Sequence, residues 1–244
     1  MNVEKRRLQV LAKEWHGCQR CKLHEMRVGP DIFFGYGKST PAKYLIVGGT
    51  PTESDEVFSG LFAGDEGELL FKLLRTANID LDECYFTYSV ACRPKVFIPA
   101  TDTEDERIEG RPPSKEEVIA CRPRLYEILY QVDPRAIITL GESATKALVR
   151  GRLPKFLDCL GKQYISLLPA ATPEDRVDGK ATGKSRYHDL QYPVFPIPEM
   201  MSIINNPSTA DHGPHAVALR TLQKAHQTVE FVIKSELATM KGSP

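Results

Sequence analysis

The stretch KYLIVGGTP, residues Lys43–Pro51, joins a short apolar run to a loop of glycine, threonine and proline. An amphipathic segment, ELLFKLLRTA at Glu68–Ala77, follows this loop. The spacing of the apolar residues predicts a strand, a loop and then a helix. Two further apolar runs, YFTYSVA at Tyr85–Ala91 and AIITL at Ala136–Leu140, also have the length and composition of buried strands.

Helical patterns separate and follow these strands. A helix predicted at 114–132 begins with Ser114 at the N-cap and Glu117 three positions later, which is the pattern of a capping box. A second helix is predicted from Gly141, and His215–Leu237 has the spacing of a long amphipathic helix. Strands that alternate with helices favour a parallel sheet covered by helices on both faces.

The composition is that of a globular chain without a strong overall charge. Its 244 residues and 41% hydrophobic content suit one α/β domain with a sizeable core. Lys and Arg number 32, as do Asp and Glu, so affinity for an anionic polymer requires a local basic patch. Because neither a membrane-spanning run nor a secretory leader is present, we expect a cytoplasmic protein with no membrane contact.

We expect residues 1–238 to form a single domain and residues 239–244 to form a flexible tail. Two stretches interrupt the alternation of strands and helices: residues 95–113, rich in proline and acidic side chains, and residues 169–192, which are mainly polar. Both are predicted to be mobile surface insertions and are candidate contact sites for a protein partner. The protein itself is expected to be a monomer.

Four of the six cysteines have a spacing that suggests a metal centre. Cys18 and Cys21 form a C-x2-C pair, Cys92 follows a predicted strand, and Cys121 lies in a predicted helix. Disulfides are not expected in a reducing compartment, and four thiolates can hold an iron–sulfur cluster or a structural zinc. Zinc knuckles usually contain two close pairs, so one pair followed by two single cysteines favours a cluster.

Ordinary burial is the alternative for these cysteines. Free cysteine is most often a small buried apolar residue, and this interpretation remains open for Cys92 and Cys121. It is the expected state of Cys84 and Cys159.

Five phrases of the sequence occur in the order found in a known family. They are CQRCKLHEMR at Cys18–Arg27, LIVGGTPTESDEVFSGLFAGDEGELLFKLL at Leu45–Leu74, YFTYSVACRP at Tyr85–Pro94, PPSKEEVIACRPRL at Pro112–Leu125 and DPRAIITLGESATKALV at Asp133–Val149. Through them the chain resembles the iron–sulfur uracil-DNA glycosylases, often called family 4, and the wider uracil-glycosylase superfamily. The resemblance implies a three-layer α/β/α fold with a central, mostly parallel four-stranded sheet.

The resemblance also implies a cofactor, a partner and a reaction. The reaction is hydrolysis of the N-glycosidic bond of uracil, or of another altered pyrimidine, in single- or double-stranded DNA once the base is flipped out. The expected cofactor is a [4Fe-4S] cluster with a structural role, held by Cys18, Cys21, Cys92 and Cys121. Phe62 has the position of the aromatic residue that stacks on the base. The other implied pocket residues are Gly48, Gly49, Thr50, Pro51 and Tyr88.

The polar residues of the family's pocket are replaced at the matching positions of this sequence. Gly49 stands in place of a carboxylate, Thr52 in place of a glycine, and Tyr88 in place of the asparagine that reads the base. Without gaps, VFPIPEMMSIINNP at Val194–Pro207 matches Glu199 to the family's histidine and Met200 to the proline of its wedge. A gapped alternative matches Asn206-Pro207-Ser208 to the family's H-P-S motif.

Carboxylates are therefore the remaining candidates for catalysis. Glu199 could donate a hydrogen bond to a leaving base only if a raised pKa keeps it protonated. Glu53, Asp55 and Glu56 follow the Pro51 loop and are candidates for activating water, although acids on a loop are often only solvated. Met200 is a candidate apolar wedge. Basic residues that could contact phosphates are Arg93, Arg111, Lys146, Arg150 and Arg152.

Three functions remain open on the sequence. The first is a DNA glycosylase with non-standard catalytic residues. The second is a catalytically inactive DNA-binding or assembly module that retains the fold and the cluster. The third is a zinc-stabilised α/β protein unrelated to DNA.

Overall fold

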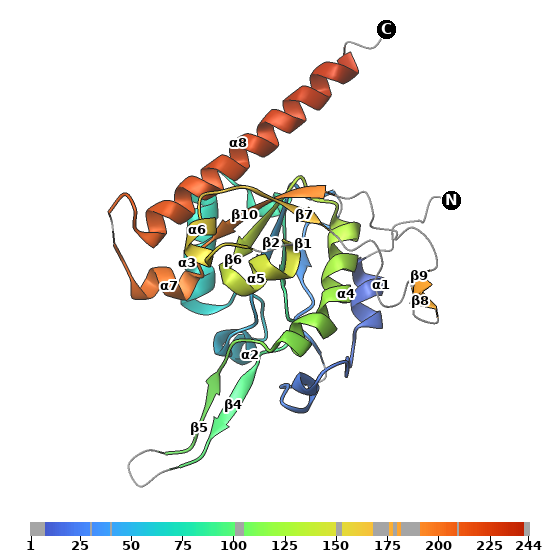
Figure 1. The fold of residues 1–244 in the computed structure, drawn as a ribbon, viewed down its shortest axis with the longest axis vertical. Helices are drawn as coiled ribbons and strands as arrows, with labels where there is room; N and C mark the ends of the chain where they lie inside the picture. Colours follow the sequence, from blue (N-terminus) through green and yellow to red (C-terminus); the bar gives the residue numbers. More distant parts are fainter. Residues whose placement is uncertain are drawn as a thin grey trace.

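A six-stranded sheet forms the centre of the computed structural model (Figure 1). The model describes residues 8–29, 31–39, 41–100, 105–149, 153–167, 176–177, 180–181, 191–208 and 210–241. The strands, in their order across the sheet, are β1 (Tyr36–Gly37), β3 (Cys84–Tyr88), β2 (Tyr44–Gly48), β6 (Ala136–Leu140), β10 (Gln191–Ile197) and β7 (Tyr164–Leu167).

The four central strands are parallel, as the sequence predicts. β2 pairs in parallel with β3 and β6, and β10 pairs in parallel with β6. The short edge strands β1 and β7 pair antiparallel with β3 and β10 and were not predicted. The predicted mostly parallel sheet is therefore confirmed, and it has six strands because an antiparallel strand is added at each edge.

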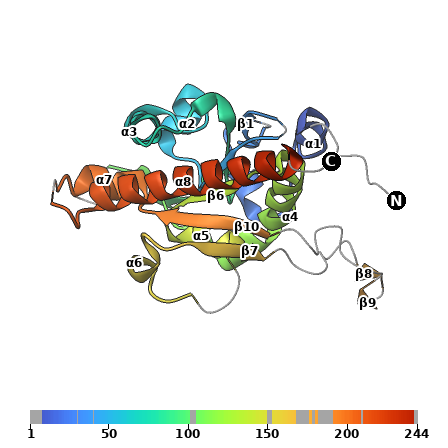
Figure 2. The same cartoon turned by 90° about the horizontal axis from the view of Figure 1, so that it is seen from above.

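Helices cover both faces of the sheet, which confirms the three-layer arrangement (Figure 2). The first face is covered by α1 (Leu8–Glu14), α4 (Lys115–Val132) and α5 (Gly141–Leu148). The second is covered by α3 (Gly64–Thr76), α7 (Met200–Asn205) and α8 (Pro214–Lys241). Shorter elements are α2 (Glu53–Phe58), α6 (Phe156–Cys159) and the 3-10 helices η1 (Lys22–Glu25) and η2 (Leu81–Glu83).

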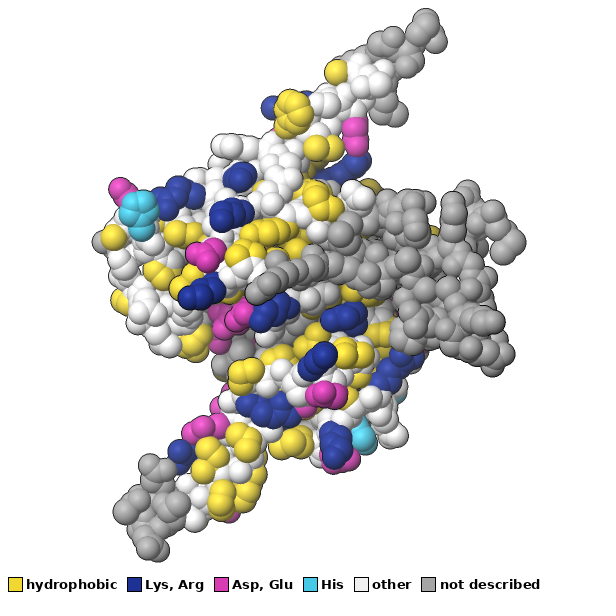
Figure 3. All heavy atoms as spheres, viewed as in Figure 1, with side chains coloured by type: hydrophobic (Ala, Val, Ile, Leu, Met, Phe, Trp, Pro, Cys, Tyr) yellow, Lys and Arg dark blue, Asp and Glu magenta, His cyan; other side chains and the backbone are white. Residues whose placement is uncertain are grey.

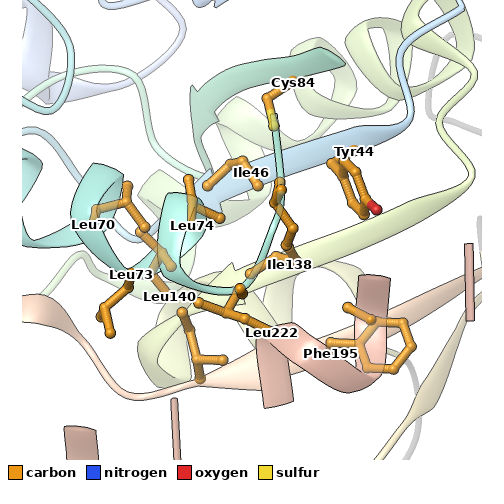
Figure 4. Packing of buried hydrophobic residues seen from close by; sticks show 14 of the residues in the cluster. Tyr44, Ile46, Leu70, Leu73, Leu74, Cys84, Ile138, Leu140, Phe195 and Leu222 are labelled. Carbon is orange, nitrogen blue, oxygen red and sulfur yellow. The ribbon is translucent and has the colours of Figure 1, made fainter. Parts of the chain in front are cut away.

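The alternation of side chains along β2 divides the core into two clusters. Leu45 and Val47 point to the first face, and Tyr44 and Ile46 point to the second, because successive residues of a strand face opposite sides. Figure 4 shows the second cluster, in which leucines of α3 pack beside Ile46. All five residues of β2 are buried, as expected for a central strand covered on both faces.

Residues 95–113 contain regular structure that the sequence pattern did not predict. β4 (Lys95–Ile98) and β5 (Arg107–Gly110) pair antiparallel and form a hairpin that projects from the domain (Figure 1). The hairpin exposes hydrophobic side chains, which Figure 3 shows in yellow on the lower projection. Phe97 and Ile108 lie opposite each other in it and are both exposed.

The second insertion and the predicted C-terminal tail are described only in part. Most of the second insertion, 169–192, lies outside the described residues, although β8 (Arg176–Val177) and β9 (Lys180–Ala181) pair antiparallel within it. α8 continues to Lys241, past the predicted start of the tail at residue 239, and residues 242–244 lie outside the described residues. Among the described helices, none has the length and apolar character needed to cross a membrane.

Candidate active site

A cavity of about 570 Å³ lies at the carboxyl ends of β2, β3 and β6. The parallel register aligns the ends of these strands, and ligands of open α/β sheets bind at such ends. The cavity is in the size range of small-molecule sites. All six residues predicted for the base pocket line it: Gly48, Gly49, Thr50, Pro51, Phe62 and Tyr88. Glu53, Glu199 and Met200 also line it.

The rings of Phe62 and Tyr88 are stacked inside this cavity. Their centroids are 4.5 Å apart and their planes differ by 25°. A Cβ atom on Gly48 would lie 2.6 Å from the Tyr88 ring, so only glycine allows the ring to lie over the end of β2. Tyr88 therefore covers one face of the aromatic residue that was predicted to stack on a base.

The hydroxyl of Tyr88 is engaged inside the protein. It donates a hydrogen bond to Asp55 Oδ2 at 2.8 Å and accepts one from the backbone N–H of Phe62 at 3.0 Å. Burial and the charge of Asp55 raise the pKa of Tyr88, so the hydroxyl stays protonated and remains a donor. Phe62 itself has a φ of 55°, an unfavourable conformation for a bulky residue, and these hydrogen bonds hold it there.

Asp55 lies beneath the cavity and is not among the residues that line it. Its side chain is fully buried, and its oxygens accept hydrogen bonds from the Thr52 backbone N–H, the Ala63 backbone N–H and the hydroxyls of Thr52 and Tyr88. With Thr52 it forms the capping box of α2. Both oxygens of Asp55 therefore hold the loop, and its role in activating water stays a prediction.

The other two acids of this segment lie on α2 and not on a loop as predicted. The side chain of Glu56 is only 9% exposed and forms ion pairs with Arg93 at 3.1 Å and Lys95 at 2.8 Å, which join α2 to the base of the hairpin. Glu53 is exposed at the rim of the cavity and contacts Arg93 at 3.1 Å. Of the three, only Glu53 remains at the cavity.

Two glutamates from different elements face the cavity. Glu199, directly before α7, packs over Gly141, where a Cβ atom would lie 2.1 Å from Glu199 Cγ. Burial and then the charge of Glu142 raise the pKa of Glu199. Glu66, in the first turn of α3, also has a raised pKa, caused first by burial and then by Asp55 and Glu199. Both carboxyls therefore hold a proton to higher pH than usual.

Glu66, Glu142 and Ser143 also line the cavity, although no sequence pattern predicted this. Glu66 belongs to the acidic first turn of an amphipathic helix, where such residues usually serve only the helix dipole. No local pattern distinguishes a glutamate that faces a cavity from one that faces solvent. Only the packing of α3 against α7 reveals its position.

Most of the basic residues predicted to contact phosphates are engaged with carboxylates. Arg111 binds Glu117 through two hydrogen bonds of 2.9 and 2.6 Å, and Lys146 contacts Glu142 at 2.5 Å. Arg93 pairs with Glu53 and Glu56, as described above. Arg150 and Arg152 lie outside the described residues.

The four predicted ligand cysteines lie in one region beside α4. Cys92 and Cys121 are buried in a small cluster with Leu23, and Cys21 packs against it. The pKa of Cys21 is raised by burial and by the neighbouring charges of Cys121 and Cys18. The pKa of Cys92 is raised to about 11, first by burial and then by Cys121. The packing therefore brings Cys21, Cys92 and Cys121 into one cluster.

Among the described residues, no three His, Cys, Asp or Glu side chains are arranged to hold one metal ion. A [4Fe-4S] cluster binds each thiolate through a different iron atom, so its ligands stand farther apart than those of zinc. Cys84 and Cys159 are buried elsewhere in the fold, as predicted.

Comparison with known proteins agrees with the fold. The model of the uracil DNA glycosylase superfamily matches residues 34–222. A protein of Saccharolobus solfataricus named type-4 uracil-DNA glycosylase is 28% identical over 156 residues, which cover 64% of this chain and 64% of that protein. The chain thus spans slightly less than two thirds of that relative's length.

Two other relatives carry the same name. The protein of Sulfurisphaera tokodaii is 25% identical over 205 residues, covering 82% of this chain and 77% of that protein. The protein of Pyrobaculum aerophilum is 31% identical over 160 residues, covering 64% and 74%. Because the family model covers residues 34–222, which include every central strand and all of the residues that line the cavity, the chain belongs to the uracil-DNA glycosylase superfamily.

Proposed function

We propose that this protein is a DNA glycosylase that hydrolyses the N-glycosidic bond of uracil, or of another altered pyrimidine, in DNA. The observation that carries the proposal is the cavity of about 570 Å³ at the carboxyl ends of the parallel strands, lined by the Gly48–Thr52 loop and by Phe62. A base removed from the helix needs a pocket with an aromatic wall. The names of the three relatives give the same substrate class.

The chemical step requires help for the departing base and a water near the sugar. Glu199 and Glu66 are the candidates for proton transfer, because their raised pKa values bring them closer to the range of an efficient general acid or base. Glu199 in its protonated form could donate a hydrogen bond to the leaving base. Glu53 at the rim is the remaining candidate for orienting water.

The substrate range should differ from that of a pocket with an asparagine at position 88. A tyrosine whose hydroxyl is bound to Asp55 and to the Phe62 N–H has no free donor or acceptor for the edge of uracil. Recognition would then depend on the backbone of the Gly48–Thr52 loop and on the two glutamates. We therefore propose slow turnover of uracil or preference for another modified pyrimidine.

We further propose that Cys18, Cys21, Cys92 and Cys121 hold a [4Fe-4S] cluster. The donor set fits such a cluster. Cys18 and Cys21 come from the loop after α1, Cys92 from the segment after β3, and Cys121 from α4. Arg27 lies near Cys92 and Arg124 lies near Cys121, and both arginines favour a negatively charged centre. The cluster would cross-link segments that are distant in sequence, and this structural role is the chemistry it supplies. Cys18 and Cys21 follow α1, so the cluster would also fix the segment that follows this helix.

The direct test is a panel of oligonucleotides that contain uracil, 5-hydroxymethyluracil or hypoxanthine, assayed for both binding and release of free base. Release of any pyrimidine by protein with a full iron content would support the proposal. Binding without release from the whole panel would overturn it and identify a DNA-binding module instead. Iron and sulfide analysis of anaerobically purified protein tests the cluster independently of activity.

A further inference from the structure

Arg124 is the largest side chain that is completely buried, and it anchors the end of β3. Its Nη1 donates to the carbonyl oxygen of Phe34 and to Thr87 Oγ1, both at 3.0 Å. Its Nη2 donates to the carbonyl oxygen of Tyr88. The Thr87 hydroxyl also donates to the Phe34 carbonyl at 2.7 Å, which completes a closed network.

No carboxylate in the described part of the chain contacts the guanidinium of Arg124. The side chain of Cys121, one helical turn earlier on α4, also interacts with the guanidinium. The nearby groups that could carry negative charge are Cys121, Tyr85 and Cys92. Tyr85 is not one at neutral pH, because burial raises its pKa to about 12.

A buried guanidinium without a counter-charge is strongly unfavourable. Neutral thiols cannot compensate it, whereas thiolates bound to a metal cluster keep their negative charge at any pH at which the cluster exists. The position of Arg124 is therefore explained when the cysteine site is loaded. Its Nε atom has no hydrogen-bond partner, so the contacts to oxygen atoms alone do not satisfy the group.

The same side chain reaches the base pocket through Tyr88. Arg124 holds the backbone of Tyr88, and the Tyr88 hydroxyl holds Asp55 and Phe62. The next residue continues the link, since the Ser89 N–H donates to the Gly48 carbonyl at 2.8 Å and the Ser89 hydroxyl to the Gly49 carbonyl at 2.6 Å. Hydrogen bonds thus connect Arg124, through Tyr88 and Ser89, to the Gly48–Gly49 loop that lines the cavity.

We propose that Arg124 is a positioning residue that connects the cluster to the base pocket. The cluster supplies the counter-charge of the guanidinium, and the guanidinium fixes the end of β3 from which Tyr88 and Ser89 extend. This inference rests on the proposed cluster but not on any particular substrate. It assigns the cluster a role in shaping the pocket, in addition to cross-linking the chain.

The experiment compares the wild type with Arg124→Met, which removes the charge, and Arg124→Lys, which keeps the charge but not the fork of donors. Arg122→Met, on the same helix but without a contact to the pocket, is the matched control. Iron content, the visible cluster spectrum and the rate of cluster loss to a chelator are measured for each. We expect Arg124→Met to lose its cluster at least about tenfold faster than the wild type, with Arg124→Lys intermediate.

A second measurement uses only the wild-type protein, in case Arg124→Met does not fold. The cluster is removed with a chelator, and amide hydrogen exchange is followed at Phe62, Ser89 and Val90. We expect exchange at these amides to rise at least about tenfold, because the end of β3 is no longer fixed. Exchange in α8, on the far side of the sheet, should change much less.

The outcomes separate this inference from the proposed cofactor. A wild-type protein without iron would overturn the cluster itself. A wild-type protein with iron, together with equal cluster lifetimes in Arg124→Met and the wild type, would overturn only the role of Arg124. Unchanged exchange at Phe62 and Ser89 after cluster removal would also contradict the link to the pocket.

Discussion

The Tyr88 hydroxyl donates a 2.8 Å hydrogen bond to Asp55 Oδ2, and this single contact joins the end of β3 to the start of α2. Through the same oxygen atom Tyr88 accepts from the N–H of Phe62, while Asp55 Oδ1 accepts from the next N–H, that of Ala63, at 2.9 Å. The two side chains therefore hold both sides of the strained turn that presents Phe62 to the cavity. The tyrosine at position 88 therefore maintains the shape of the pocket.

Tyr88→Phe tests this structural role. The substitution keeps the stacked ring but leaves the buried Phe62 N–H without its acceptor and removes one of the three hydrogen bonds that Asp55 Oδ2 accepts, so we expect a loss of about 1–3 kcal/mol in the free energy of unfolding. Urea denaturation provides the measurement. Tyr36→Phe is the matched control: Tyr36 is exposed on β1, and its substitution should change stability by less than about 0.5 kcal/mol. Equal effects of the two substitutions would contradict the role.

Tyr88→Asn tests whether the ring restricts the pocket. Removing it exposes a face of Phe62 and places an amide with one donor and one acceptor group near Gly48. We expect release of uracil from single-stranded DNA to increase about tenfold per molecule of folded protein, because the base can then stack and pair with the amide. Tyr88→Phe, which keeps the ring, should give no such gain. No increase with Tyr88→Asn would mean that Tyr88 is not the obstacle.

Glu56 and Glu53 offer a comparison between a buried and an exposed ion pair. Glu56→Gln leaves Arg93 and Lys95, whose side chains are 9% and 7% exposed, without their buried carboxylate, and should cost about 3 kcal/mol. Glu53→Gln removes a carboxylate that is 71% exposed and should cost less than about 1 kcal/mol. Thermal or urea denaturation of both variants gives the difference. Similar costs would show that Glu56 is not what anchors the hairpin.

Cys92→Ser tests the cysteine site. A serine hydroxyl is a poor ligand for iron, so we expect the variant to lose most of its iron and the visible absorption of the cluster. Cys84→Ala is the control, because Cys84 is buried in the second core cluster and should not affect iron content. Metal analysis after anaerobic purification distinguishes them. Full iron content in Cys92→Ser would exclude this residue as a ligand.

The raised pKa of Glu66 predicts a dependence of stability on pH. Burial, with the charges of Asp55 and Glu199, places its folded-state pKa above the ordinary value of 4.5. Between these two values the folded state binds more protons than the unfolded chain, so the free energy of unfolding falls as the pH rises through that window. Glu66→Gln should remove this part of the slope. Glu68→Gln, an exposed position on the same helix, should leave the slope unchanged, and a slope equal to that of the wild type in Glu66→Gln would refute the prediction.

Local sequence patterns predict most of the layered fold, because three of the four central strands, β2, β3 and β6, carry a signal of their own, whereas β10 was not predicted from a pattern. β2 and β6 are continuous apolar runs, and α4 begins at Ser114 with the predicted capping box to Glu117. The order of motifs also placed the Gly48–Thr52 loop and Phe62 at one cavity. Short edge strands such as β1, with two residues, lack enough sequence for a periodic signal and could not be found in this way.

Which carboxylates of the site are exposed, and which are held by hydrogen bonds or ion pairs, depends on the tertiary structure. Glu53, Asp55 and Glu56 lie within four residues of one another, yet one is exposed, one is fully buried and one is paired with two basic side chains. Glu66 reaches the cavity only because α3 packs against α7. Whether a carboxylate can contact a substrate depends on partners that are distant in the chain, such as Tyr88 and Arg93. The local sequence does not indicate such contacts.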